Sequence, residues 1–312
     1  MRVAALFAVL TLIVGACTSA GASQPPAPAT PAPATVAPAT AAPTPAPTPT
    51  PDACAPANLQ LKTAGKLTIG TDNPAFPPWF GGEPPAGSEW QVSDPLSGNG
   101  YEGAFAYALA EKLGFTKENV VWVAVPFNNV IQPGPKDFDI DINQVSFSPE
   151  RAEAVDLSDG YFDNSQAVVA NADTPITSAK SVADLKGFKL GATVATTSLA
   201  YINDNIKPTA ETAVYGTNDA AVAALQAKQV DGIVVDLSTA FYMVGAQLDN
   251  GAIAGSLPTI GTPDSFSVAL NKGSALTACV NAAIAALKAD GTLDALRTEW
   301  IDSQGNAPAL AP

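Results

Sequence analysis

The sequence predicts an α/β fold for the part of the chain that runs from about residue 53 to residue 312. Short strand-like runs alternate there with helical patterns, which is typical of sheets whose strands are largely parallel. Hydrophobic residues make up 47% of the chain and charged residues only 14%, as in a well-packed globular body. This part is long enough for two modest domains.

Five runs rich in apolar and β-branched residues predict the strands. They span residues 66–70, 120–125, 139–142, 189–193 and 232–235. Elsewhere, apolar residues recur at helical spacing and predict amphipathic helices. These stripes consist of Phe105, Leu109 and Leu113; Val222 and Leu225; Leu276, Val280, Ala283, Ile284 and Leu287; and Leu293, Leu296 and Trp300.

Capping residues mark the ends of two of these helices. Thr217 and Asn218 are candidate N-caps of the second helix, and Gly291 is placed to end the third. Residues 81–100 are polar and rich in Gly and Pro, so they predict a surface loop.

The first sixteen residues predict a signal peptide. Arg2 precedes an apolar run over residues 3–14, and this run is shorter than the roughly 20 residues needed to span a bilayer. Residues 14–17, Val-Gly-Ala-Cys, resemble a bacterial lipoprotein box, which implies cleavage before Cys17 and lipidation of its thiol. An ordinary signal peptide followed by an incidental cysteine is the alternative.

Residues 17–51 predict a disordered stalk behind the lipidated cysteine. From Ser19 to Pro51 the chain is almost wholly Ala, Pro, Thr and Ser, which cannot bury enough apolar surface to fold. At about 3.1 Å per residue, such a segment reaches up to roughly 100 Å.

The charge and the missing histidines exclude several functions. A net charge of −14 repels nucleic acid and anionic lipid. The chain has no His, hence no ready general base near neutral pH and no His-based metal site. We therefore expect no catalytic residue, no metal and no cofactor.

Three cysteines leave an even pair once Cys17 is lipidated. In an oxidising compartment we expect Cys54 and Cys279 to form a disulfide, with two free buried thiols as the alternative.

Polar residues follow four of the predicted strands, where ligands bind in open α/β sheets. These residues are Asp72; Asn143, Gln144 and Ser146; Thr196, Thr197 and Ser198; and Asp236.

Eight stretches in order along the chain carry a resemblance to a known family. They are residues 66–72, 76–79, 145–151, 155–161, 181–187, 195–198, 230–236 and 287–300. Over essentially all of residues 60–305 the chain resembles the polar-amino-acid class of periplasmic binding proteins. The resemblance implies the type II fold, with two α/β lobes, helices on both faces of each sheet and two hinge strands. Residues 52–164 and 263–312 would form the first lobe, and residues 165–262 the second.

The resemblance also implies how a free amino acid is held. Arg151 matches the arginine that binds the ligand α-carboxylate, just inside a helix capped by Ser148; a surface pair with Glu150 or Glu153 is the alternative. Ser146 and Thr197, beside Thr196, match donors to the same carboxylate. Asp236 matches the acceptor of the α-ammonium.

The side-chain slot of the family matches aromatic residues here. Phe76 and Phe127 match its lining, and we expect Trp79 close by. Asp72 matches the acid that meets a basic ligand side chain. Asn143 and Gln144 depart from the small residues usual in the family, so they either contact the ligand or narrow the slot.

The resemblance implies a lipid-anchored protein on the outer face of the cytoplasmic membrane or in the periplasm. We expect a monomer that captures an amino acid, polar or cationic rather than acidic, and delivers it to the permease of an ABC transporter. A sensor for a membrane receptor, a dehydratase on the same fold and a structural lipoprotein are the alternatives.

Overall fold

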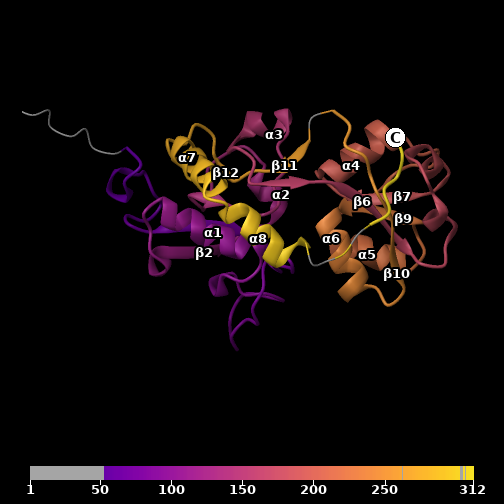
Figure 1. Ribbon diagram of the computed structural model, residues 1–312, viewed down its shortest axis with the longest axis horizontal. Coiled ribbons are helices and arrows are strands. Elements are labelled where there is room, and N and C mark those ends of the chain that lie inside the picture. The colour runs from indigo at the N-terminus through magenta and orange to yellow at the C-terminus, as the bar shows by residue number, and fades with distance from the viewer. Residues whose placement is uncertain (1–52, 262, 303–304, 306) are drawn as a thin grey trace, which may run out of the picture. The chain divides into compact units, whose positions relative to one another are not determined.

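The computed structural model describes residues 53–261, 263–302, 305 and 307–312. The predicted signal peptide over 1–16, the stalk over 17–51 and the lipidated Cys17 lie outside these residues. The fold described below belongs to the compact unit Thr50–Pro312 (Figure 1).

The first five-stranded sheet has the strand order β2-β1-β3-β12-β4. Its strands are β1 (Leu67–Thr71), β2 (Val120–Ala124), β3 (Ile140–Asp141), β4 (Val155–Leu157) and β12 (Ala269–Asn271). Strand β1 runs parallel to β2 and β3, whereas β12 runs antiparallel to β3 and β4. Every residue of β1 is buried, as befits a strand that has neighbours on both sides and both faces covered.

Three helices cover one face of this sheet and lie side by side (Figure 1). They are α1 (Tyr101–Lys112), α7 (Leu276–Ala289) and α8 (Thr292–Trp300). Alternation along β3 sends Ile140 into the core beneath these helices and Asp141 to the opposite face. The opposite face packs a smaller apolar cluster that includes Val125, Val130 and Phe138.

The second five-stranded sheet has the strand order β10-β6-β9-β7-β8. Its strands are β6 (Gln166–Asn171), β7 (Leu190–Thr193), β8 (Ala213–Tyr215), β9 (Gly232–Asp236) and β10 (Gly251–Ser256). The helices α4 (Thr197–Tyr201), α5 (Asn218–Gln226) and α6 (Leu237–Tyr242) belong to this lobe. Alternate residues of β6 enter two separate apolar clusters, so both faces of the sheet are covered.

Single-turn and irregular helices fill several connections. They are η1 (Pro56–Asn58), η2 (Pro95–Ser97), η3 (Lys117–Asn119), η4 (Pro175–Ser178), η5 (Val182–Gly187), η6 (Ile202–Ile206) and η7 (Met243–Gln247). The short α-helices α2 (Phe127–Val130) and α3 (Pro149–Ala154) follow β2 and β3 respectively.

Two short strands pair antiparallel where the chain passes between the lobes. They are β5 (Phe162–Asn164), which leads into β6, and β11 (Asp264–Phe266), which leads back into β12. The two-lobed fold with two hinge strands is therefore confirmed. The expectation of parallel-dominated sheets was wrong, because each large sheet has two parallel and two antiparallel pairs. The strands that enter directly from the hinge, β6 and β12, run antiparallel to both of their neighbours in the sheet.

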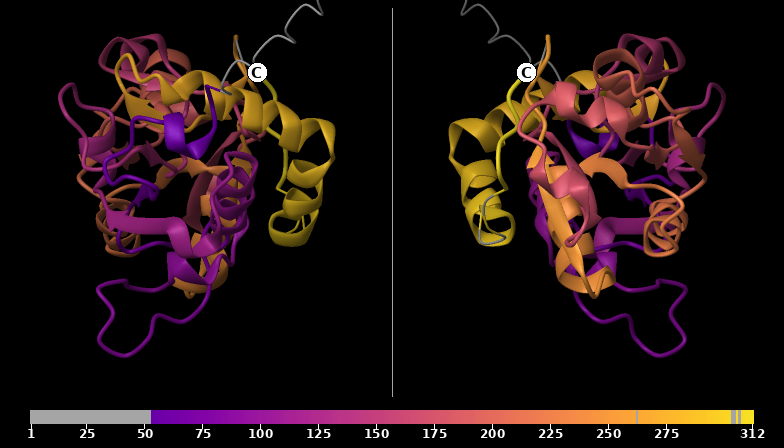
Figure 2. Two further views of the ribbon diagram at one scale, coloured as in Figure 1. Left: turned by 90° about the vertical axis from the view of Figure 1, so that its left-hand side faces the viewer. Right: turned by 90° about the vertical axis from the view of Figure 1, so that its right-hand side faces the viewer.

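The predicted elements and caps are found in the structure. All five predicted strands and all four predicted helices form. The Thr217 hydroxyl accepts the N–H of Ala220, and Gly291 follows the end of α7 with a left-handed φ of 79°. Residues 81–100 form a loop that stands out from the body in Figure 2 and is anchored by the buried Trp90 and Ser93.

The disulfide and the C-terminal residues complete the fold. Cys54 and Cys279 are bonded, as the cysteine count predicted, and this ties the start of the described chain to α7. Residues 309–311 were expected in the first lobe. Instead Ala309 and Ala311 pair with Ser256 and Ser181, and Leu310 joins an apolar cluster of the second sheet. The tail follows the second lobe because its backbone hydrogen bonds are satisfied there.

Candidate ligand-binding site

A cavity of about 370 Å³ lies at the carboxyl ends of strands from both large sheets. Ten of the eleven residues that the sequence predicted to bind ligand line it. They are Asp72, Phe76, Phe127, Asn143, Gln144, Ser146, Arg151, Thr196, Thr197 and Asp236. The strand-end rule and the family resemblance therefore point to the same cavity.

Arg151 supplies the positive charge of the cavity. Helix α3 begins as predicted, with the Ser148 hydroxyl accepting the N–H of Arg151 at 3.2 Å. Arg151 is 8% exposed, and its guanidinium donates to the carbonyl oxygens of Ser146 (2.6 Å) and Ala195 (2.7 Å). It also lies 5.3 Å from the centre of the Phe127 ring.

No described carboxylate forms an ion pair with Arg151. The alternative, a surface ion pair with Glu150 or Glu153, is therefore not found in the structure. Burial lowers the pKa of Arg151, and the negative charges of Asp264 and Asp236 partly offset this. A buried guanidinium without a paired carboxylate favours an anionic ligand group, because the anion replaces lost solvation.

Hydroxyl groups from both lobes stand beside this charge. The Ser146 and Thr197 hydroxyl oxygens are 3.5 Å apart, one from each lobe. Thr196 also lines the cavity, but its hydroxyl accepts the N–H of Leu199 and donates to the carbonyl of Thr193. Thr196 is thus the N-cap of α4, whereas the Thr197 hydroxyl lies among the polar side chains that surround the cavity.

Asp236 supplies the negative charge of the cavity at the end of β9. One of its oxygens accepts from the side-chain amides of Asn164 and Gln166, each at 2.6 Å. The same two amides donate to Asp264 at 3.2 Å, which also accepts from Thr197 at 3.2 Å. Burial, followed by the neighbouring charge of Asp264, raises the pKa of Asp236 to about 7. A bound cation would therefore relieve the repulsion between two carboxylates.

Sequence reasoning missed Asn164, Gln166 and Asp264. Two of them lie on the hinge strands β5 and β11, and Gln166 lies opposite Asp236 in the register of β6 and β9. The only available signal was a polar residue at the start of the apolar run 166–171, and that strand was not predicted.

Trp79 does not line the cavity, so its prediction as a ligand contact was wrong. Its ring is 2% exposed and packs edge-on against Tyr101, Phe162 and Phe266 at centroid distances of 5.8, 5.1 and 5.3 Å. The turn after Phe76 sends Phe76 to the cavity and Trp79 to the core between α1 and the hinge strands.

Asp72 has a structural contact as well as a place in the slot. Its carboxylate accepts the N–H of Asn73 at 2.8 Å and the backbone N–H of Phe127 at the start of α2. Burial nevertheless raises its pKa. Asp72 therefore holds the helix that carries Phe127, and it keeps acceptor capacity for a ligand.

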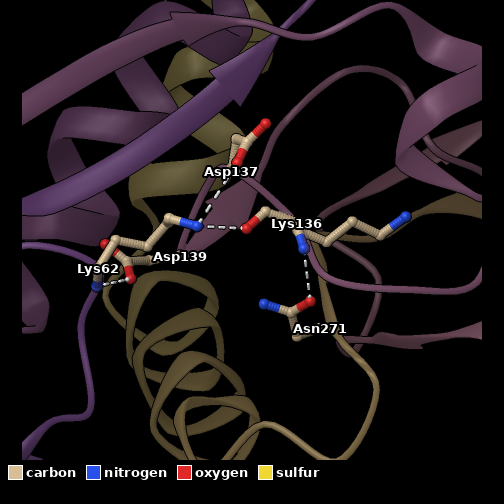
Figure 3. Close-up of polar contacts among 5 residues, drawn as sticks. All are labelled: Lys62, Lys136, Asp137, Asp139 and Asn271. Carbon is tan, nitrogen blue, oxygen red and sulfur yellow. Dashed lines mark hydrogen bonds and ion pairs between the residues drawn. The ribbon is translucent and has the colours of Figure 1, made fainter.

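The loop between α2 and β3 is held by polar contacts of two lysines (Figure 3). Lys62 donates through Nζ to the carbonyl of Lys136 and lies 3.7 Å from Asp137. Its backbone N–H donates to Asp139 at 2.7 Å, and Asn271 accepts the N–H of Lys136 at 3.0 Å. The buried Lys136 ammonium also donates to the carbonyl of Asn129 at 2.8 Å. These contacts hold α2, and with it the Phe127 ring, against the first sheet.

A two-lobed α/β fold, joined by two hinge strands and carrying a cavity with residues of opposite charge, defines the class of solute-binding proteins. The chain belongs to the bacterial extracellular solute-binding proteins, family 3, which it matches over residues 68–303. Among described residues, no group of His, Cys, Asp and Glu is suited to hold a metal ion. No described helix is long and apolar enough to cross a membrane.

Relatives and solved structures agree with this assignment. The L-cystine-binding protein TcyJ of Escherichia coli (strain K12) is 29% identical over 250 residues, which are 77% of this chain and 84% of that protein. An ancestral arginine-binding protein bound to arginine has a TM-score of 0.60 and 26% identity, over 76% of this chain and 98% of that one. An ancestral amino acid-binding protein described as a precursor of cyclohexadienyl dehydratase has a TM-score of 0.60 and 25% identity, over 76% and 96%.

Proposed function

We propose that this protein captures a free amino acid between its two lobes and delivers it to an ABC importer. One observation carries the proposal: the cavity is lined by a buried guanidinium from the first lobe and by a carboxylate from the second. An amino acid has the complementary pair of charges on its α-carbon, whatever its side chain. The names of the relatives, which bind cystine or arginine, support the same ligand class.

Arg151 and Asp236 bind different groups of the ligand. The α-carboxylate meets Arg151 with the hydroxyls of Ser146 and Thr197, and the α-ammonium meets Asp236. The remaining space, lined by Asp72, Phe76 and Phe127, takes the side chain. Since Arg151 is the one cationic side chain among the described residues that line the cavity, polar or cationic ligand side chains suit the slot and acidic ones do not.

The proposed role in transport also implies where the protein is located. We place it in the periplasm or on the outer face of the cytoplasmic membrane, as a monomer anchored through lipidated Cys17 after removal of residues 1–16. Its partner is the permease of the importer. No dehydratase activity is proposed, because the cavity is lined by residues of both charges, as a free amino acid requires, and the sequence has no His to serve as a general base.

Titration calorimetry with the twenty amino acids tests the proposal. At least one polar or cationic amino acid should bind the wild type, and Arg151→Ala should weaken it at least tenfold. A charge-assisted bond contributes roughly 1.5–3 kcal/mol, which corresponds to that loss. The control is Arg297→Ala, which removes a half-exposed arginine of α8 and should leave binding unchanged. If no amino acid binds, or if Arg151→Ala binds as well as the wild type, the proposal is wrong.

A further inference from the structure

Gln144 lines the cavity in an unusual backbone conformation. It follows β3 with a positive φ of 47°, a region that residues other than Gly occupy uncommonly. Such a conformation is strained for a residue with a side chain and persists only where the surroundings hold it. The contacts of Gln144 show what holds it.

Glu102, in the first turn of α1, holds Gln144 at two points. Its side chain is fully buried, and its Oε1 accepts the backbone N–H of Gln144 at 2.8 Å. Its Oε2 accepts the side-chain amide Nε2 of Gln144. The Tyr161 hydroxyl also donates to Oε1. Glu102 lines no part of the cavity, so it acts there only through Gln144.

The Tyr161 ring is itself locked in the core. Tyr161 is 3% exposed, and its ring stacks on Phe105 at a centroid distance of 4.3 Å. The backbone carbonyl of Tyr161 accepts a hydrogen bond from the Tyr101 hydroxyl at 2.9 Å. Three donors on a rigid frame therefore converge on one carboxylate. An ionised carboxylate can only accept hydrogen bonds, so the NH₂ end of the Gln144 amide has to face Glu102.

The oxygen end of the Gln144 amide is left for the cavity. No described group donates to this Oε1, and it is not among the buried side-chain atoms that lack a partner. The Asp72 carboxylate beside the side-chain slot is an acceptor as well, whereas the side-chain nitrogen of Asn143, which also lines the cavity, is a buried donor with no described partner.

We propose that Gln144 is a specificity-determining residue, held by the positioning residue Glu102, that selects amino acids whose side chains end in an N–H donor. Neutral amide and cationic side chains meet the Gln144 oxygen with a donor, whereas a carboxylate side chain would place a third acceptor beside the oxygens of Gln144 and Asp72. The proposal rests on the function proposed above and narrows its ligand class. A buried acceptor left facing another acceptor loses affinity, because neither oxygen is then solvated or bonded.

The test compares glutamine with glutamate, which have nearly the same shape and differ in donor or acceptor character. Burial raises the pKa of Glu102 to about 7, so titrations are run at pH 8, where the carboxylate is ionised. The wild type should bind glutamine or arginine at least tenfold more tightly than glutamate. Gln144→Met keeps the volume and removes the amide, and should bring the ratio of glutamine to glutamate affinity to within about threefold.

Two more variants separate selection from stability. Gln144→Gly suits the positive φ and keeps the N–H that Glu102 binds, so it should fold and also lose the discrimination. Glu102→Gln can donate to the Gln144 oxygen and turn the amide, so glutamate should gain affinity relative to glutamine. Glu111→Gln, at an exposed position of the same helix, is the control and should keep the wild-type ratio.

Each outcome decides the matter. A wild-type ratio retained in both Gln144→Met and Gln144→Gly overturns the inference, even if Glu102→Gln fails to fold. A wild type that binds leucine or glutamate more tightly than glutamine and arginine also overturns it, while the proposed function stands. If none of the twenty amino acids binds, it is the proposed function that fails, and the inference falls with it.

Discussion

Asp236→Asn should change how the stability of the ligand-free protein depends on pH. The carboxyl group of Asp236 has a pKa raised from 3.8 to about 7, because it is buried and because Asp264 lies beside it. At about 1.4 kcal/mol for each pH unit, this rise corresponds to at most about 4 kcal/mol. The free energy comes from protonating a carboxyl that the folded protein disfavours in its ionised form.

The sign follows from proton uptake. Between pH 3.8 and 7 the folded state holds a proton on Asp236 that the unfolded state has released. Stability from this group is therefore fully present below pH 3.8 and is lost as the pH rises through about 7. Glu102, with its pKa raised to about 7 by burial, adds a loss of the same sign. The wild type should thus be less stable at pH 8 than at pH 5.

Urea unfolding at pH 5 and pH 8 measures the effect. The asparagine variant cannot ionise, so its loss of stability between the two pH values should be smaller than that of the wild type by about 2–3 kcal/mol. Asp163→Asn, at an exposed position of β5, is the control and should behave as the wild type does. Equal pH dependence in the wild type and Asp236→Asn would show that Asp236 is not a buried, proton-binding carboxyl. A saturating amino acid should also reduce the loss, because its ammonium replaces the proton.

Three further outcomes are expected. Removing the disulfide with Cys54→Ser and Cys279→Ser together should lower stability by up to about 5 kcal/mol, because the bond closes a loop between residues 225 apart; an unchanged urea midpoint under non-reducing conditions would contradict this. Trp79→Ala should lower the free energy of unfolding by about 3–5 kcal/mol because it leaves a cavity in the core, whereas Phe76→Ala should lower it less and weaken ligand binding more. Urea unfolding and calorimetry of both variants measure the two effects, and the reverse pattern would contradict the prediction. Lys136→Met should destabilise the fold by about 1–3 kcal/mol, since it leaves the carbonyl of Asn129 without this donor, and hydrogen exchange should show the loss at residues 127–132.

Local patterns in the sequence were sufficient for many of the elements. The cap by Ser148 and the position of Arg151 follow from four consecutive residues, and both are as predicted. The helix over residues 276–289 follows from one apolar stripe. Each of these features depends on sequence neighbours within one or two helical turns, so the local sequence is sufficient to predict it.

The errors share one physical cause. Trp79 and Phe76 lie in the same short turn, and nothing local distinguishes a ring that faces the ligand from one that faces the core. The mixed sheets depend on the direction in which β6 and β12 enter from the hinge. That direction follows from pairing between strands far apart in the sequence, on which the apolar pattern of a single strand has no bearing.

The α/β class and the cysteine pair could be predicted from the sequence, and so could ten of the residues that line the cavity, through the strand ends and the family resemblance. The partners that hold those residues in place became known only from the folded structure. Asp264 accepts a hydrogen bond from Thr197, which is 67 positions away in the sequence, and Glu102 accepts one from Gln144, which is 42 positions away. Such contacts form because buried polar groups must find partners wherever the fold brings them together, and sequence spacing does not reveal those partners.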